Sequence, residues 1–259
     1  MDRTEDPVTD PCERMENEMK PMRLDKYLAE MGRGTRSQIK QDLKRGLVTV
    51  NGQVEKSADR KVDPVMDQVT YAGEAVSYVA YEYYMLHKPA GCISATEDRR
   101  EQTVLDLITD CSRDDLFPVG RLDKDTEGLL LITNDGDLAH RLLHPKKHVD
   151  KTYLTRLRGE ATEEMVRMFA DGLDIGDDKP TLPAVMEILS VGEISEVKIT
   201  IREGRFHQIK RMVEAVGSEV LYLKRLTMGS LVLDETLEPG QYRPLTQAEK
   251  DALGVEGRA

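Results

Sequence analysis

The pattern in this chain best suited to chemistry is a carboxylate on a short loop that leads into an apolar run. Asp123 lies in Gly120–Gly128, GRLDKDTEG, and Leu129–Ile132 follows directly. Because Leu122 and the apolar run lie on either side of Asp123, we expect the carboxylate at the edge of a core. On spacing alone, such an aspartate more often caps local amides or pairs with a neighbour such as Arg121.

A second candidate is a group of bases at the expected start of a helix. The helix is predicted by apolar residues at helical spacing, which are Ile209, Met212, Val213 and Val216. Its bases lie in or just before the first turn: Arg205, His207, Lys210 and Arg211. The helix dipole favours anions at that end, so the cluster is unfavourable unless an anion compensates. One interpretation is a bland surface cluster. The other is that one base pairs with a buried carboxylate.

Several separated motifs resemble those of one enzyme family. GRLDKDTEGLLLITNDGDLAHRLLHP resembles the central motif of the pseudouridine synthases, in the branch that modifies ribosomal RNA (the RsuA family). Four further stretches look like that family, in its order: KPAGCISAT from Lys88, KTY from Lys151, EGRFHQIKRM from Glu203 and PGQYRPLT from Pro239. Together the matches span roughly residues 83–250.

The resemblance implies roles for individual residues. Asp123 would be the nucleophile toward a sugar carbon, acting on a uridine that has left its stack. Lys210 would pair with Asp123 and keep it ionised. Tyr153 would stack on the uracil and help to remove the proton from C5. Arg121 would fill the gap left by the extruded nucleotide, and Leu223 would pack against the uracil ring.

The resemblance also implies how the remaining bases and cofactors enter. Arg205, His207 and Arg211 would hold RNA phosphates. Many members of the broader superfamily have arginine where this chain has Lys210, and lysine gives a less directional pair. The reaction of this family converts uridine to pseudouridine, which is an isomerisation. It needs no redox change and no energy input, so we expect no cofactor and no metal. The sequence agrees, since it has neither a Walker loop nor a GxGxxG fingerprint.

Residues 22–66 predict a small basic module. Thr35 is expected to cap a helix that runs to about Arg45, Gly46 to follow its end, and residues 48–54 to form a hairpin about Asn51-Gly52. Cations recur along that helix or lie beside it: Arg33, Arg36, Lys40, Lys44 and Arg45. The pattern is similar to the RNA-binding module shared with a small-subunit ribosomal protein, which grips phosphates by position and charge. A solvated helix face is the alternative.

The whole chain predicts an α+β protein with two folded parts. We expect a disordered leader over 1–21, the RNA-binding module over 22–81 and a catalytic domain over 82–259 with a mixed, mainly antiparallel sheet flanked by helices. A net charge of −11 opposes RNA binding, because it repels a polyanion at long range. RNA affinity would therefore come from the basic module and from local patches.

Composition bounds the cellular setting. The three cysteines are widely spaced, which fits free thiols in a reducing cytoplasm better than disulfides or a zinc site. No run of apolar residues is long enough to predict a membrane span. We expect a monomer that acts on rRNA, preferably of the small subunit, or on an assembling ribosomal particle. The alternatives are a synthase acting on 23S rRNA and a non-catalytic RNA-binding or ribosome-assembly protein.

Overall fold

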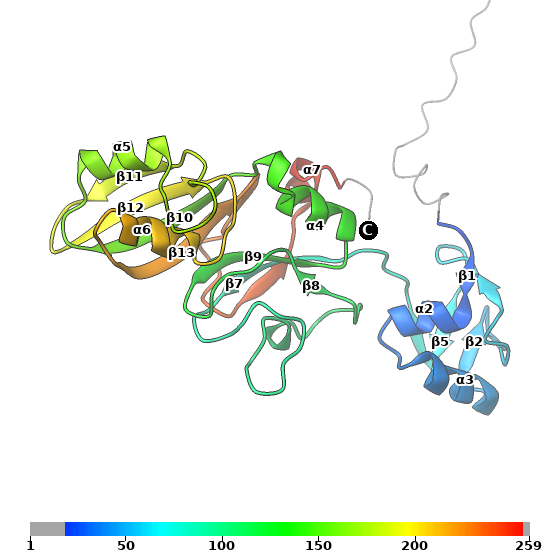
Figure 1. Cartoon of the computed structure of the whole chain (residues 1–259). Helices are drawn as coiled ribbons and strands as arrows, with labels where there is room; N and C mark the ends of the chain where they lie inside the picture. The colour runs from blue at the N-terminus through cyan, green and yellow to red at the C-terminus, as the bar shows by residue number, and fades with distance from the viewer. Residues whose placement is uncertain (1–18, 256–259) are drawn as a thin grey trace, which may run out of the picture. The chain divides into compact units, whose positions relative to one another are not determined.

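The computed structural model of the chain describes residues 19–255 (Figure 1). Most of the predicted leader, residues 1–18, lies outside the described range. The described residues form two compact units. One comprises the residues up to Glu82 together with Asp110–Asp115, and the other comprises Tyr83–Thr109 and Leu116–Val255.

The first unit is two helices on a small sheet. Helices α2 (Leu24–Glu30) and α3 (Arg36–Arg45) share one apolar core with strands β2 (Val48–Val50) and β5 (Val69–Tyr71). The sheet has the order β3-β2-β5-β6, where β3 is Gln53–Val54 and β6 is Glu74–Val76. A further pair joins β1 (Met22–Arg23) to β4 (Lys61–Val62).

Local sequence explains the position of α3. The Thr35 side chain accepts from the Gln38 amide and the Gln38 side chain bonds back to Thr35, which is a capping box. Gly46 follows the helix at φ 79°, a left-handed conformation that glycine adopts without strain. Both features are as predicted, and so is the β2–β3 hairpin.

The second unit is built on a nine-stranded sheet whose main path runs β11-β12-β10-β13-β9-β7-β15. These strands are β7 (Tyr83–Lys88), β9 (Glu127–Thr133), β10 (Lys151–Arg158), β11 (Val185–Ser190), β12 (Ile194–Ile201), β13 (Val220–Met228) and β15 (Tyr242–Pro244). Two short strands complete it: β8 (Phe117–Pro118) pairs with β9, and β14 (Leu231–Val232) pairs with β13. Within the described chain, the strands pair antiparallel except β13 with β9. The predicted α+β class with a mixed, mainly antiparallel sheet is confirmed.

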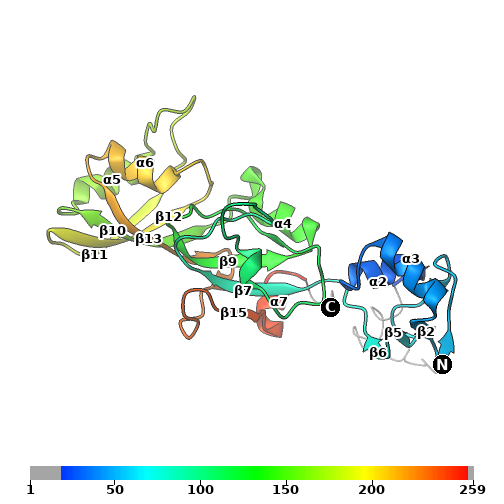
Figure 2. The ribbon, with the colours of Figure 1, turned by 90° about the horizontal axis from the view of Figure 1, so that it is seen from below.

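Helices of this unit lie over the sheet. Helices α5 (Glu163–Asp171) and α6 (Gln208–Ala215) share one apolar core with β10–β13, and Figure 2 shows both on the same side of these strands. The unit has two further helices, α4 (Gly136–Leu143) and α7 (Gln247–Ala252), and two short helices, η1 (Leu105–Leu107) and η2 (Pro145–Lys147). Asp135, which follows β9, caps α4 by accepting from the Leu138 amide.

Candidate active site

The loop that carries Asp123 is fixed by the segment after β7. The Ser94 hydroxyl donates to the Leu122 carbonyl at 2.9 Å and accepts from the Leu122 amide at 3.0 Å. The Gly91 amide donates to the Lys124 carbonyl at 2.7 Å. The residues on both sides of Asp123 are therefore tied to the KPAGCISAT segment, which restricts where the carboxylate can lie.

A buried lysine reinforces this loop. Lys88 is fully buried, and its Nζ donates to the carbonyls of Thr126 and Pro89 at 2.9 Å each and of Lys124 at 3.3 Å. Burial lowers the pKa of Lys88, because the charged form loses its hydration. The three donors of an ammonium are thus all used on backbone oxygens, and two of those oxygens belong to the loop between Asp123 and β9.

A lysine and a histidine approach Asp123. Lys210 Nζ lies 3.5 Å from Oδ2 of Asp123, and His207 Nε2 lies 3.6 Å from Oδ1. Both distances are longer than those of strong charge-assisted hydrogen bonds. The Asp123 side chain is 29% exposed, so it is recessed but accessible. Asp123 therefore lies beside a lysine ammonium and an imidazole while its carboxylate remains partly accessible.

The shortest contacts of Lys210 are with a different carboxylate. Its Nζ donates to the two carboxylate oxygens of Asp125 at 2.6 and 2.8 Å. Partial burial raises the pKa of Asp125, but the hydrogen bond and charge of Lys210 outweigh it and leave that pKa below its ordinary value. Lys210 is therefore shared, and Asp125 holds the ammonium within ion-pair distance of Asp123.

The site lies at the pairing of β9 with β13, where β7, β9 and β15 meet β10–β13. Strands β9 and β13 pair in parallel through Glu127 with Lys224 and Gly128 with Arg225. Arg225 is buried, and its Nε donates across this junction to the Leu129 carbonyl at 2.7 Å. The loop bearing the two aspartates leads into β9. The segment that bears Lys210 and His207 packs with β13. Asp123 and Lys210 therefore lie close together only while β9 and β13 remain paired.

An apolar wall connects the predicted site residues. Tyr153 on β10 and Leu223 on β13 are both buried, and they belong to the same core cluster as Leu122 and Ile209. Leu122 precedes Asp123, and Ile209 precedes Lys210. The structure therefore brings the sequence neighbours of the predicted nucleophile and its cation into one cluster with the predicted stacking tyrosine.

The other predicted RNA contacts differ in their surroundings. Arg121 is exposed and makes no hydrogen bond or ion pair with any residue in the range 19–255. Arg205 and Arg211 both pair with Asp177 and donate to backbone carbonyls, so their guanidinium groups are engaged by protein acceptors. Contact of either arginine with RNA phosphate stays a prediction.

The cations of the first unit form an exposed stripe on α3. Arg36, Lys40 and Lys44 are exposed and have no ion pair within the described part of the chain. Arg33 approaches Glu74 at 3.5 Å and Arg45 approaches Asp42 at 3.4 Å, so these two are partly neutralised. The three unpaired cations are thus the stronger candidates for phosphate contacts.

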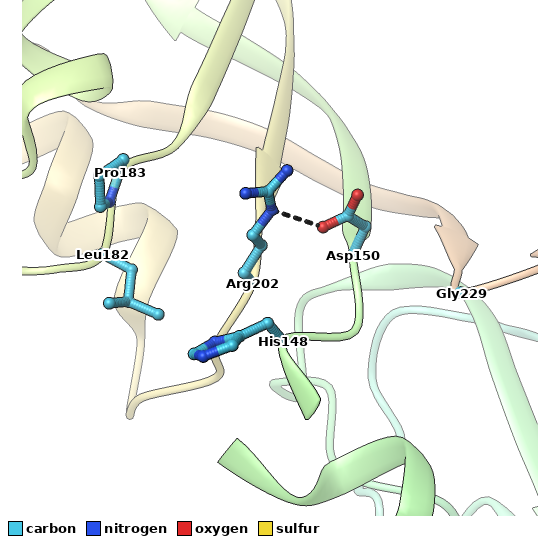
Figure 3. A pocket seen from close by; sticks show the side chains of 6 residues that line it. All are labelled: His148, Asp150, Leu182, Pro183, Arg202 and Gly229. Atoms are coloured by element: carbon cyan, nitrogen blue, oxygen red, sulfur yellow. Dashed lines mark hydrogen bonds and ion pairs between the residues drawn. The ribbon is translucent and has the colours of Figure 1, made fainter. Parts of the chain in front are cut away.

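A separate cavity of about 590 Å³ lies beside β10 and β12 (Figure 3). It is lined by His148, Asp150, Leu182, Pro183, Arg202 and Gly229. Arg202 Nε donates to Oδ1 of Asp150 at 2.9 Å, so its principal charges neutralise one another. None of the predicted catalytic residues lines this cavity.

Sequence reasoning missed the residues that support the site. Lys88 and Ser94 lie in the KPAGCISAT motif, yet nothing in a single sequence indicates that either one bonds to the Asp123 loop. Asp125 was visible as the second carboxylate of DKD. Its pairing with Lys210, 85 residues away, needs the fold.

The described residues provide neither a membrane span nor a metal-binding cluster. Between residues 19 and 255, no helix is long and apolar enough to cross a membrane. The same described residues hold no group of three or more histidines, cysteines or carboxylates placed to bind a metal ion.

Comparison with known proteins identifies the family. The profile described as RNA pseudouridylate synthase matches residues 82–215, and the S4 domain profile matches residues 22–69. The chain belongs to the RNA pseudouridylate synthase family. The match supports the resemblance stated above, and the S4 domain corresponds to the predicted RNA-binding module.

Individual relatives agree along nearly their whole length. The chain is 50% identical over 234 residues to the uncharacterized RNA pseudouridine synthase YtzG of Bacillus subtilis, covering 90% of this chain and 98% of the relative. It is 40% identical over 234 residues to ribosomal small subunit pseudouridine synthase A of Haemophilus influenzae, covering 90% and 99%. A crystal structure of a pseudouridylate synthase matches with a TM-score of 0.63 and 39% identity, covering 90% of this chain and 99% of that chain.

Proposed function

We propose that this synthase converts a specific uridine of small-subunit ribosomal RNA to pseudouridine, with Asp123 as the nucleophile. The observation that carries the proposal is the environment of this carboxylate. Asp123 is recessed in a loop that Lys88 and Ser94 fix, and Lys210 and His207 approach it within 3.6 Å.

Asp123 begins the reaction by attacking C1′ of the target nucleotide. The bond between uracil N1 and C1′ breaks, and its electrons leave with the uracil. Lys210 Nζ, 3.5 Å from Oδ2, pairs with this carboxylate. The target base must first leave its stack, because C1′ is not accessible to a protein carboxylate inside a stacked helix.

The second half of the reaction joins the uracil to the same sugar carbon. The uracil turns so that C5 faces C1′, the C5–C1′ bond forms, and the bond to Asp123 breaks. The C5 proton is then removed and N1 gains a proton, so the numbers of protons in uridine and pseudouridine are equal. Tyr153 stacks on the ring during the turn and its hydroxyl assists the proton transfer, while Leu223 closes the apolar side.

RNA is held mainly by charge and position outside the catalytic loop. The exposed stripe of Arg36, Lys40 and Lys44 lies along phosphates, and Arg121 occupies the gap that the extruded nucleotide leaves. Contacts of this kind fix the register of an RNA without reading its sequence. They also allow a protein with a net charge of −11 to bind a polyanion locally.

The small subunit is proposed as the target because several relatives at about 40% identity carry that target in their names. Mapping pseudouridines in both rRNAs from cells with and without this gene tests the assignment. We expect one small-subunit site to disappear and to return with the wild-type gene. Loss of a large-subunit site instead would transfer the activity to 23S rRNA. Unchanged maps would favour a non-catalytic role in ribosome assembly.

A further inference from the structure

An exposed aromatic ring lies beside the catalytic loop. Phe206 is 76% exposed, in a chain with three phenylalanines and no tryptophan. Its ring stacks on that of His207 with centroids 3.8 Å apart and planes 19° apart. His207 in turn approaches Asp123 at 3.6 Å. The pair of rings therefore extends from the carboxylate toward solvent.

Scattered exposed apolar residues are common on proteins and need no function. Phe206 differs because its backbone is braced. The Arg211 guanidinium donates to the Phe206 carbonyl at 2.9 Å and pairs with Asp177 at 2.7 Å. On the other side, Arg205 donates to the carbonyls of Lys179 and Pro180. The two arginines thus fix the segment that presents the ring.

The backbone beside the ring is also strained. His207 adopts φ 49° and ψ 34°, the left-handed region, immediately before α6. A residue with a Cβ is disfavoured there, and such conformations concentrate at functional sites. The His207 ring that follows from this backbone contacts Phe206 and approaches Asp123.

We propose that Phe206 and His207 form a platform on which a nucleobase adjacent to the target uridine stacks. Unpaired RNA bases bind proteins by stacking on aromatic rings, and every base offers a π face. The proposal rests on the proposed function and deepens it. When the target nucleotide leaves its stack to reach Asp123, the bases on both of its sides lose a stacking partner. One of these bases stacks on Phe206, while Arg121 occupies the gap in the stack. Phe206 is a positioning residue and takes no part in bond breaking.

The test measures coupling between the ring and the base. A short RNA spanning the uridine modified by the wild-type protein is made in an intact form and in forms with an abasic nucleotide on either side of the target. Affinity is measured for the wild type, Phe206→Ala and Phe206→Tyr. We expect Phe206→Ala to bind intact RNA about 5- to 150-fold more weakly, as ~1–3 kcal/mol per stacked base implies. Phe206→Tyr should bind like the wild type.

The abasic RNA separates stacking from a general loss of apolar surface. On the RNA lacking the stacked base, wild type and Phe206→Ala should bind equally. Val232→Ala is the matched control, because Val232 is 63% exposed on β14 of the same unit, and it should behave as wild type on every RNA. At saturating RNA, Phe206→Ala should keep its kcat while its KM rises.

Two outcomes overturn the proposal in distinguishable ways. A wild-type protein that modifies rRNA, combined with equal losses for Phe206→Ala on intact and abasic RNA, refutes the platform alone. A wild-type protein that forms no pseudouridine in rRNA refutes the proposed function and the platform with it.

Discussion

Gly128 lies where β9 pairs with β13, and its replacement by alanine tests how the site is held together. A Cβ added there would lie 2.2 Å from the carbonyl oxygen and 2.6 Å from the amide nitrogen of Arg225. Both atoms are backbone, so no side chain can turn away to make room. The glycine also has φ +104°, which residues with a Cβ rarely adopt.

The size of the effect follows from these two conflicts. A positive φ costs roughly 1–2 kcal/mol in a residue with a Cβ, and overpacking adds about 1–3 kcal/mol. The sum of ~2–5 kcal/mol corresponds to a fall in Tm of about 4–20 °C at ~2–4 °C per kcal/mol for a domain of this size. Turnover below the new Tm should also fall, because separating β9 from β13 moves Asp123 away from Lys210.

Thermal unfolding followed by circular dichroism, together with pseudouridine formation on rRNA at 20 °C, measures both effects. Gly136→Ala is the matched control. Gly136 begins α4, its φ is not in the left-handed region, and nothing lies within 4 Å of an added Cβ. The control should leave Tm and turnover unchanged. A Gly128→Ala protein with the Tm and rate of the wild type would refute the close junction.

Two further predictions separate binding from chemistry. Changing Arg36, Lys40 and Lys44 together to Gln should flatten the slope of log affinity against log salt by roughly 2–3 units, at about 0.7–0.9 per phosphate. An unchanged slope with normal affinity would mean that the stripe does not contact RNA. Tyr153→Phe should reduce kcat less than Asp123→Asn does, because the ring still stacks and only the hydroxyl is lost. An equal and complete loss of activity in single-turnover assays would contradict this division of roles.

Much of the fold was predictable because it depends on local signals. Thr35 caps the start of α3 and Gly46 follows its end, and both are recognisable from neighbouring residues. The turn Asn51-Gly52 sets the β2–β3 hairpin. Such features need only a few adjacent residues, so one sequence is enough to find them.

The order of strands in the sheet was not predictable in this way. The parallel pairing of β9 with β13 joins residues almost 100 positions apart, and two residue pairs carry it. Gly128 reads in the sequence as an ordinary loop glycine, and its close approach to Arg225 appears only when both strands are placed. Long-range pairing of this kind leaves no periodic signal.

The candidate site divides along the same line. Asp123 and Lys210 were chosen from resemblance, and the structure brings them within 3.5 Å. The stronger partner of Lys210 is Asp125, which the sequence offered as an unremarkable neighbour. Lys88 would be expected on the surface from its charge, yet it is fully buried under the loop. Its location depends on three backbone carbonyls that no side-chain pattern reports.

The central claim is that Asp123, and not the carboxylate two residues away, is the nucleophile. Asp123→Asn and Asp125→Asn each remove one negative charge from the same loop and keep the side-chain shape, so they form a matched pair. Pseudouridine formation on small-subunit rRNA should be abolished in Asp123→Asn while its Tm and RNA affinity match the wild type. Asp125→Asn should retain turnover, since Lys210 can then pair with Asp123 alone. Normal pseudouridine formation by Asp123→Asn would contradict the account.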